Sequence, residues 1–329
     1  MVMIAVLGLV VLCTTVALAA QVQPNILMIV ADDFGYNDVG YHQSTPTAPK
    51  PHPANPLGEA TTDAAAGVMP TPTLDQLASE GTKLEMYYVQ PLCSPTRATF
   101  MTGRYPFHTG LGPDVICTSC GDPYGLPARE ILMPALLREA GYTTAAIGKC
   151  VQCTIWLRHA SSLVYQLVFF SRKRVFSTVF FFYLTGCVVR RWHLGDCDER
   201  YLPTFRGFDH FLGYMAGAQS YYHHAGDFRN GSAGDGLPPC VGESVANNYS
   251  TLLYASEAAR IVRWHAQTSS AESRNDGPID AANSLFLYLA FQSVHNPYDV
   301  PPPSLIDVNV SFPNIVQYSR RIYAGSKLL

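Results

Sequence analysis

The sequence predicts an α/β fold in which helices flank a mostly parallel central sheet. Short apolar runs alternate with helical patterns along the chain, as expected when crossover helices join parallel strands. Polar residues follow several of these runs. With 329 residues, of which 48% are hydrophobic and 14% charged, the chain can also bury a sizeable core. Sheets of this kind bind ligands beyond the carboxyl ends of their strands, so we expect the functional residues there.

The sequence predicts three strands, at residues 25–30, 142–148 and 284–294. None of them contains a charged residue, which is typical of parallel strands buried on both faces. The first strand leads to Asp32 and Asp33. Lys149 directly follows the second strand, and His295 follows the third. We therefore expect these four side chains to meet at one edge of the sheet.

The sequence predicts four helices, at residues 71–81, 95–103, 129–141 and 249–266. The first has Thr71 as its N-cap, Pro72 at the first helical position and Gly81 as its end. The second begins at Pro95, whose fixed φ suits a helix start. Residues 43–70 are rich in Pro, Ala and Thr and are expected to form a surface loop.

The stretch PLCSPTRATFMTGR at 91–104 combines a thiol with a predicted helix start. Cys93 lies at or just before the helix N-terminus, where unpaired backbone N–H groups attract an anion. Arg97 lies one turn later and offers a forked donor. Cys93 alone is equally well interpreted as a buried structural thiol, and the aspartate pair as a strand-end turn. Together, carboxylates for a hard cation, a helix N-terminus and a fixed arginine suit a tetrahedral dianion.

The same stretch resembles the signature of the type I sulfatases, whose core is C-x-P-x-R. Further segments are similar to that family, and most closely to its arylsulfatase B group: PNILMIVADDFGYNDVG, TPTLDQLASEGTKLEMYYVQ, AGYTTAAIGK, WHLG, LPTFRGFDHFLGY and FLYLAFQSVHNP. The resemblance runs from about Pro24 to Gly325, apart from the 43–70 loop and one insertion. It implies an alkaline-phosphatase-like sandwich, with a mostly parallel sheet flanked by helices, that is incomplete at the C-terminus.

The resemblance also implies the chemistry of the site. A formylglycine-generating enzyme would convert Cys93 to formylglycine, whose aldehyde hydrate supplies the attacking hydroxyl. Asp32 and Asp33, with position 93, would bind Ca²⁺. Arg97 would hold the formylglycine hydroxyls. The implied activity is sulfate-ester hydrolysis, and the implied substrate is a sulfated small molecule or glycan.

Three further residues would contact the reacting groups. By the same resemblance, Lys149 and His193 would contact the sulfate and the hydrate, and His295 would protonate the leaving oxygen. In the family pattern, Lys149 and His193 belong to one motif, G-K-W-H-L-G. Here residues 150–191 separate GK from WHLG, and we interpret this atypical insertion as a translated intron. Its removal restores the motif.

The domain organisation that we expect is a signal peptide at 1–20 followed by a partial sulfatase catalytic domain at 21–329. Residues 1–20 are apolar, and Ala17 and Ala19 fit a cleavage pattern; a short membrane anchor is the alternative. By the resemblance, the family continues past the end of this sequence with an Asp-Asn pair that completes the Ca²⁺ site. Without that pair, the site would have too few oxygen ligands.

Other signals agree with a secretory route, to the lysosome or the cell exterior. Three N-x-S/T triplets occur, at Asn230, Asn248 and Asn309. Four cysteines are disulfide candidates in an oxidising compartment: Cys117, Cys120, Cys197 and Cys240. The net charge of −3 and the scattered basic residues predict no nucleic-acid partner, and the insertion's apolar stretches are too short for a stable membrane span.

Two alternatives to an active sulfatase stay open at this stage. The insertion and the expected missing metal ligands favour a catalytically inactive fragment or pseudoenzyme of the same family. A phosphatase or phosphodiesterase of the related superfamily is the other, but such enzymes usually place Ser or Thr at the nucleophile. The C-x-P-x-R core therefore favours the sulfatase.

Overall fold

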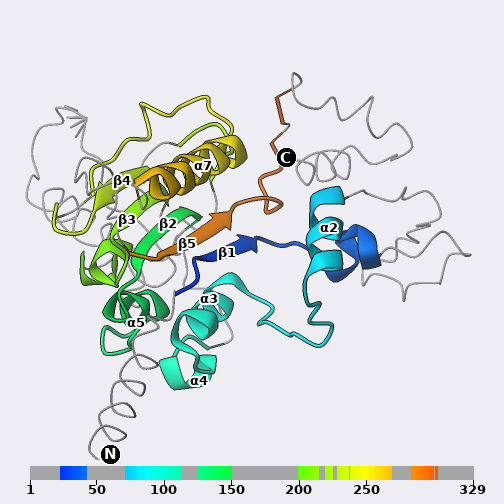
Figure 1. Ribbon diagram of the computed structural model, residues 1–329, viewed down its shortest axis with the longest axis horizontal. Helices are drawn as coiled ribbons and strands as arrows, with labels where there is room; N and C mark the ends of the chain where they lie inside the picture. The colour runs from blue at the N-terminus through cyan, green and yellow to red at the C-terminus, as the bar shows by residue number, and fades with distance from the viewer. Residues whose placement is uncertain are drawn as a thin grey trace, which may run out of the picture.

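The structure of the protein, a computed structural model, describes residues 23–42, 71–112, 125–149, 199–214, 219–224, 228–236, 238–268, 283–299 and 301–302. The expected signal peptide, the 43–70 loop, the insertion and His193 lie outside these residues. In the described part of the chain, five strands form one sheet (Figure 1). They are β1 (Ile26–Ala31), β2 (Thr143–Lys149), β3 (His210–Tyr214), β4 (Phe228–Ser232) and β5 (Leu285–Phe291).

The strand order is β1-β5-β2-β3-β4, and every neighbouring pair is parallel except the antiparallel pair β3–β4. The predicted α/β fold with a mostly parallel sheet is therefore confirmed. The three predicted strands are β1, β2 and β5. The sequence analysis did not predict β3 and β4, which are short and, in β4, largely polar.

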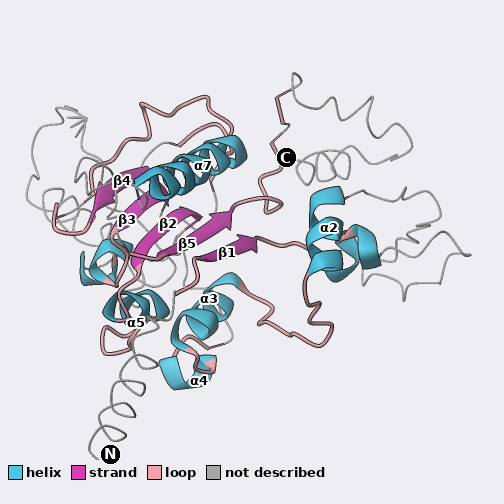
Figure 2. Ribbon diagram, in the orientation of Figure 1, coloured by secondary structure: helices cyan, strands magenta, loops and turns pink. Residues whose placement is uncertain are grey.

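Helices cover both faces of the sheet (Figure 2). The described helices are α2 (Pro72–Glu80), α3 (Cys93–Thr102), α4 (Pro106–Thr109), α5 (Met133–Glu139) and α7 (Ser250–Thr268). Figure 1 shows α7 over one face and α3 and α5 over the other. The predicted helix at 129–141 is shorter in the structure, because Pro134 lies in its first turn and the chain before Met133 is not helical.

The central strand β5 contributes to two cores because side chains alternate between the faces of a sheet. Leu285, Leu287 and Leu289 are buried with residues of α7. Phe286 and Tyr288 are buried on the opposite face, in the core that includes α3. The strand is therefore apolar along its whole length, as the sequence indicated.

The parallel register brings the carboxyl ends of three strands together. Ala31 at the end of β1 pairs with Phe291 at the end of β5, and Gly148 near the end of β2 pairs with Ala290. Residues that follow these positions therefore lie at one edge of the sheet, as predicted.

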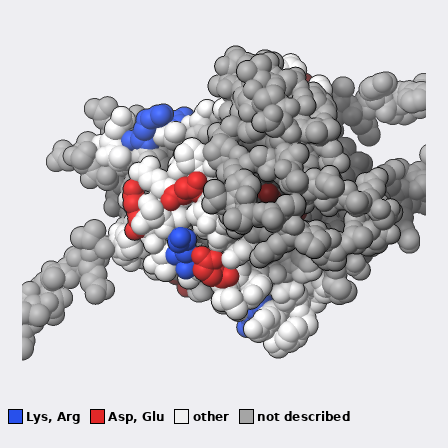
Figure 3. Space-filling view, turned by 90° about the vertical axis from the view of Figure 1, so that its right-hand side faces the viewer, with Lys and Arg blue, Asp and Glu red and all other residues white. Residues whose placement is uncertain are grey.

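Acidic and basic side chains lie side by side on the face shown in Figure 3 rather than gathering by sign, as far as the described residues show. Within the described part of the chain, no helix combines the length and the apolar character needed to cross a membrane.

Candidate active site

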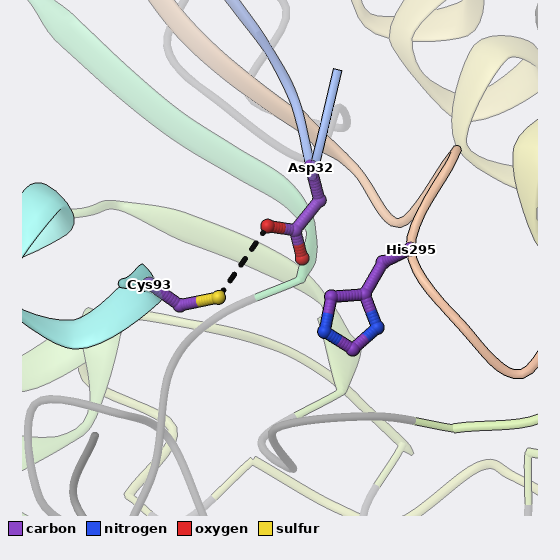
Figure 4. Close-up of side chains that lie close together, drawn as sticks. All are labelled: Asp32, Cys93 and His295. Carbon is purple, nitrogen blue, oxygen red and sulfur yellow. Dashed lines mark hydrogen bonds between the residues drawn. The ribbon is translucent and has the colours of Figure 1, made fainter. Parts of the chain in front are cut away.

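Residues from three strand ends and one helix N-terminus converge at this edge of the sheet. Asp32 directly follows β1, Lys149 is the last residue of β2, and His295 lies four residues after β5. The N-terminal residue of α3 is Cys93, one turn before Arg97. Figure 4 shows the side chains of Asp32, Cys93 and His295 gathered around one point. The structure thus brings together five of the seven predicted site residues.

The Asp32 carboxylate is the centre of the site. The Cys93 thiol donates to Asp32 Oδ1 across 3.6 Å, and Arg97 Nη2 lies 3.6 Å from the same oxygen. The ammonium group of Lys149 pairs with Asp32 Oδ2 and lies 3.9 Å from the Cys93 sulfur. Asp32, Arg97 and Lys149 are all buried, so one buried carboxylate holds two buried cations beside the thiol.

The surroundings shift the pKa of Asp32 and the pKa of Cys93 in opposite directions. Burial on its own would raise the pKa of Asp32, but the charges of Arg97 and Lys149 outweigh burial and lower it. Burial raises the pKa of the Cys93 thiol, and the Asp32 charge adds to the rise although Lys149 opposes it. The surroundings therefore favour a neutral thiol, and they do not activate Cys93 as an ordinary cysteine nucleophile, which needs a lowered pKa.

Arg97 is held by three chain segments. Its Nη1 donates to the Lys149 carbonyl oxygen at 3.0 Å and to the Tyr288 hydroxyl at 2.9 Å, while Nη2 faces Asp32. Burial opposes its charge, but Tyr288 and Asp32 outweigh burial and raise the pKa of Arg97 above its ordinary value. The guanidinium is thus a fixed positive charge behind Cys93.

Tyr288 is the site residue that the sequence analysis missed. It lies inside the apolar run of β5, for which the sequence predicts only a buried strand. A tyrosine within a buried run is itself a signal, since a buried phenol usually finds a hydrogen-bond partner. The run does not indicate which partner it finds.

The two adjacent aspartates have different surroundings. Asp33 has a φ of 58°, in the left-handed region, and the chain turns there at the end of β1. Its side chain is 58% exposed, and Oδ2 lies 3.7 Å from His295 Nε2. Asp33 therefore borders the site through His295, whereas Asp32 lies inside it.

Backbone hydrogen bonds extend the β1–β5 pairing past both strands and position His295. Asp32 N donates to the Ser293 carbonyl at 2.9 Å, and Val294 N donates to the Asp32 carbonyl at 2.8 Å. The Tyr221 hydroxyl donates to the His295 carbonyl at 2.9 Å. The imidazole is therefore tied to the same strand end as Asp32.

One group of donor atoms in the described residues is compact enough to hold a cation. One oxygen of Asp32, the Cys93 sulfur and a His295 ring nitrogen all lie within 4.8 Å of one another. Ca²⁺ prefers six to eight oxygen ligands at about 2.3–2.6 Å. Within this group only Asp32 offers oxygen, and the neighbouring Asp33 adds a second carboxylate, so a set with a cysteine thiol fits Ca²⁺ only in part.

The fold and the site define an α/β protein of the alkaline-phosphatase-like class, with its polar centre at the carboxyl ends of parallel strands. The chain belongs to the sulfatase family, because the family model described as Sulfatase matches residues 24–323. The predicted family is therefore confirmed.

Individual relatives agree with this assignment. Arylsulfatase J of Mus musculus is 31% identical over 310 residues, which cover 93% of this chain and 38% of that protein. Arylsulfatase A of Bos taurus is 30% identical over 233 residues, which cover 70% of this chain and 32% of that protein. The chain therefore spans about a third of the length of these curated relatives.

A solved structure shows the same fold over most of the chain. The crystal structure of Ps i-CgsB in complex with k-i-k-neocarrahexaose has a TM-score of 0.58 and 25% sequence identity. The match covers 92% of this chain and 51% of that one.

Proposed function

We propose that the protein hydrolyses sulfate esters, as an arylsulfatase-type enzyme whose nucleophile is formylglycine at position 93. The observation that carries this proposal is the place of Cys93. Its sulfur lies at the N-terminus of α3, 3.6 Å from Asp32 and 3.9 Å from the Lys149 ammonium. Membership of the sulfatase family supports it. A side chain in this position, once it is an aldehyde hydrate, faces the cations that a sulfate group requires.

The residues around position 93 have separate roles in the proposed reaction. Lys149 and Arg97 hold the negative charge of the sulfate and orient the hydrate. One hydrate hydroxyl attacks the sulfur and releases its proton to solvent, the bond between sulfur and the ester oxygen breaks, and His295 gives the leaving oxygen a proton. The second hydroxyl then returns a proton to His295, the bond between carbon and the sulfated oxygen breaks, sulfate departs as the aldehyde re-forms, and water restores the hydrate. His193, which lies outside the described residues, keeps its proposed contact with the sulfate.

Asp32, Asp33 and the oxygens at position 93 would hold Ca²⁺ in this proposal. Bound there, the ion neutralises and polarises the sulfate. These residues supply fewer oxygens than the six to eight that Ca²⁺ prefers, so no step of the proposed reaction depends on the ion's geometry.

The proposed substrate is a sulfated small molecule or glycan. The names of the arylsulfatase relatives favour the first, and the hexaose in the Ps i-CgsB complex favours the second. We place the protein in the secretory pathway, lysosomal or extracellular, where a formylglycine-generating enzyme would act on it. Asn230 and Asn248, in two of the glycosylation triplets, are exposed, and Cys240 is disulfide-bonded.

The proposal is tested on the chain in which Lys149 is joined directly to Trp192, made in a eukaryotic host that contains the modifying enzyme. We expect mass spectrometry of the 91–104 peptide to show formylglycine, and an aryl sulfate to be hydrolysed with Ca²⁺ present. Cys93→Ala should abolish hydrolysis, and the matched control His223→Asn, at an exposed histidine, should not. A peptide that keeps its thiol would contradict the mechanism.

The second candidate is a catalytically inactive member of the same family. It is favoured by the separation of Lys149 from His193 by residues 150–191, because catalytic side chains must be placed within about 0.5 Å. Hydrolysis by the joined form but none by the 329-residue chain, with Cys93 fully converted in both, would support this candidate for the chain that carries residues 150–191.

A further inference from the structure

Three metal-binding side chains of different kinds meet in this site when Cys93 is a thiol. Asp32 offers oxygen, Cys93 sulfur and His295 nitrogen, and their donor atoms lie within 4.8 Å of one another. Thiolate and imidazole ligands suit transition ions such as Zn²⁺, whereas Ca²⁺ takes oxygen. The chemistry of this set therefore differs from that of a Ca²⁺ site, in which the paired aspartates are the protein ligands.

Two of the donors already have the spacing of ligands around a tetrahedral ion. Cys93 Sγ and Asp32 Oδ1 are 3.6 Å apart. With bonds of about 2.3 Å to sulfur and about 2.0 Å to oxygen, that spacing corresponds to an angle of roughly 110° at the metal. Lys149 pairs with the other oxygen, Oδ2, whereas Oδ1 faces the thiol and has Arg97 Nη2 at 3.6 Å.

His295 has the surroundings that metal-bound histidines usually have. One ring nitrogen contacts the Asn296 carbonyl, and the other lies 3.7 Å from Asp33 Oδ2. Whichever nitrogen binds the ion, the other keeps a carbonyl or carboxylate partner, which fixes the ring and its tautomer. The side chain is 16% exposed, so an ion can reach it from solvent.

We propose that the thiol form of the protein binds Zn²⁺, or a similar borderline-soft divalent ion, through Asp32, Cys93 and His295. The thiol proton passes to solvent as the metal–sulfur bond forms, and water occupies the fourth position. The bound ion blocks Cys93, so a chain that carries it cannot present that side chain for other chemistry. This inference concerns the unmodified thiol and does not depend on the proposed hydrolase activity.

The test measures how fast Cys93 is alkylated in the full 329-residue chain, made in a host without the modifying enzyme. Cys93 is a free, half-buried cysteine, so iodoacetamide can reach it. The rate is read by mass spectrometry of the 91–104 peptide, with Zn²⁺, with Ca²⁺ or with a chelator. We expect Zn²⁺ to slow alkylation at least about ten-fold and Ca²⁺ to have no effect.

Variants separate the proposed site from general effects of the ion. His295→Asn should remove most of the protection, because it removes one of three ligands, while His223→Asn should keep it. Equal rates with Zn²⁺ and with chelator would overturn the proposal. So would protection that survives His295→Asn unchanged, or protection by Ca²⁺ equal to that by Zn²⁺. A peptide that contains formylglycine has no thiol to alkylate, so the assay also reads the modification separately.

Discussion

At the scale of single residues, the Tyr288 hydroxyl is the contact that makes Arg97 a fixed charge rather than a mobile one. It is one of two acceptors for Arg97 Nη1, and both side chains are buried. The Tyr288 hydroxyl accepts from the guanidinium, so we assign Tyr288 the role of a positioning residue that acts through Arg97.

Tyr288→Phe should therefore affect both folding and reaction. The change leaves a charged donor short of one buried acceptor, which costs about 1–3 kcal/mol of the free energy of unfolding. We expect a urea-denaturation midpoint below that of the parent and, in the hydrolytically active form, a lower kcat with a smaller change in KM. Tyr142→Phe is the matched control, because the Tyr142 hydroxyl makes no hydrogen bond within the described residues. Equal effects of the two variants would argue against a positioning role.

Sequence reasoning reached some of these residues and not others. Asp32, Lys149 and His295 were predictable because parallel strands share one carboxyl edge, and Cys93 because Pro95 marks a helix start. The role of Tyr288 was not predictable, since its partner is 191 positions away in the sequence. The direction of Asp33 depends on a φ of 58°, which a pair of aspartates does not reveal.

At the scale of elements, the backbone of β2 leaves no room for a side chain at Gly148 against its neighbour β5. Gly148 has a φ of +100°, and a Cβ added there would lie 2.0 Å from the Ala290 carbonyl oxygen. The glycine thus permits the close approach that places Lys149 at the site. β3 and β4 were not predicted, because each has only five residues and so shows too little of a hydrophobic pattern to be recognised.

Gly148→Ala should strongly destabilise the protein, by about 2–6 kcal/mol, because backbone strain and a clash with main chain add together. Gly103→Ala is the matched control. Gly103 also has a positive φ, of +68°, but nothing lies within 4 Å of its added Cβ, so we expect a loss of only about 1–2 kcal/mol. Chemical denaturation of both variants measures the difference. Similar losses would mean that close packing at Gly148 is unimportant.

The helix α7 is joined to β3 by an ion-paired cluster. Glu257 accepts from Arg260 Nε at 2.7 Å, and its other oxygen lies 3.3 Å from His210 Nε2. Burial on its own would raise the pKa of Glu257, but these partners outweigh burial and lower it to about 2 from 4.5. The ionised carboxylate is therefore favoured by folding.

This lowered pKa predicts how stability depends on pH. The contribution of Glu257 is fully present above pH 4.5 and is lost as the pH falls from 4.5 towards about 2. Glu257→Gln should lower stability at neutral pH by about 1 kcal/mol and flatten the curve within that window, since exposed Arg260 is screened by solvent. Denaturant titrations across the window test it. The exposed Glu243→Gln should leave the curve unchanged. A parent-like slope in Glu257→Gln would contradict the assignment.

At the scale of the whole molecule, strand ends of a single sheet contribute the site, although part of the chain between β2 and β3 lies outside the described residues. The family, the fold class and the meeting of five predicted side chains followed from strand ends and one motif. The position of His193 stays a prediction, because residues 150–191 stand between it and Lys149.

The full chain should hydrolyse aryl sulfates poorly or not at all, and the form with Lys149 joined to Trp192 should hydrolyse them faster. In the joined form, Trp192 alone would separate Lys149, the last residue of β2, from His193, which keeps both side chains at the same sheet edge. Initial rates per mole of folded protein provide the comparison. Robust turnover by the 329-residue chain would show that the insertion does not disturb the site.

The contacts of Arg97 join the ends of β1 and β2 to the middle of β5. A single side chain thus links three stretches of the chain that are distant in the sequence. Substitutions at this position should reduce the yield of correctly folded protein as well as the rate per molecule. Such variants are therefore expected to lose total activity for two reasons: less folded protein is obtained, and each molecule reacts more slowly. Dividing the activity by the amount of correctly folded chain separates the two effects.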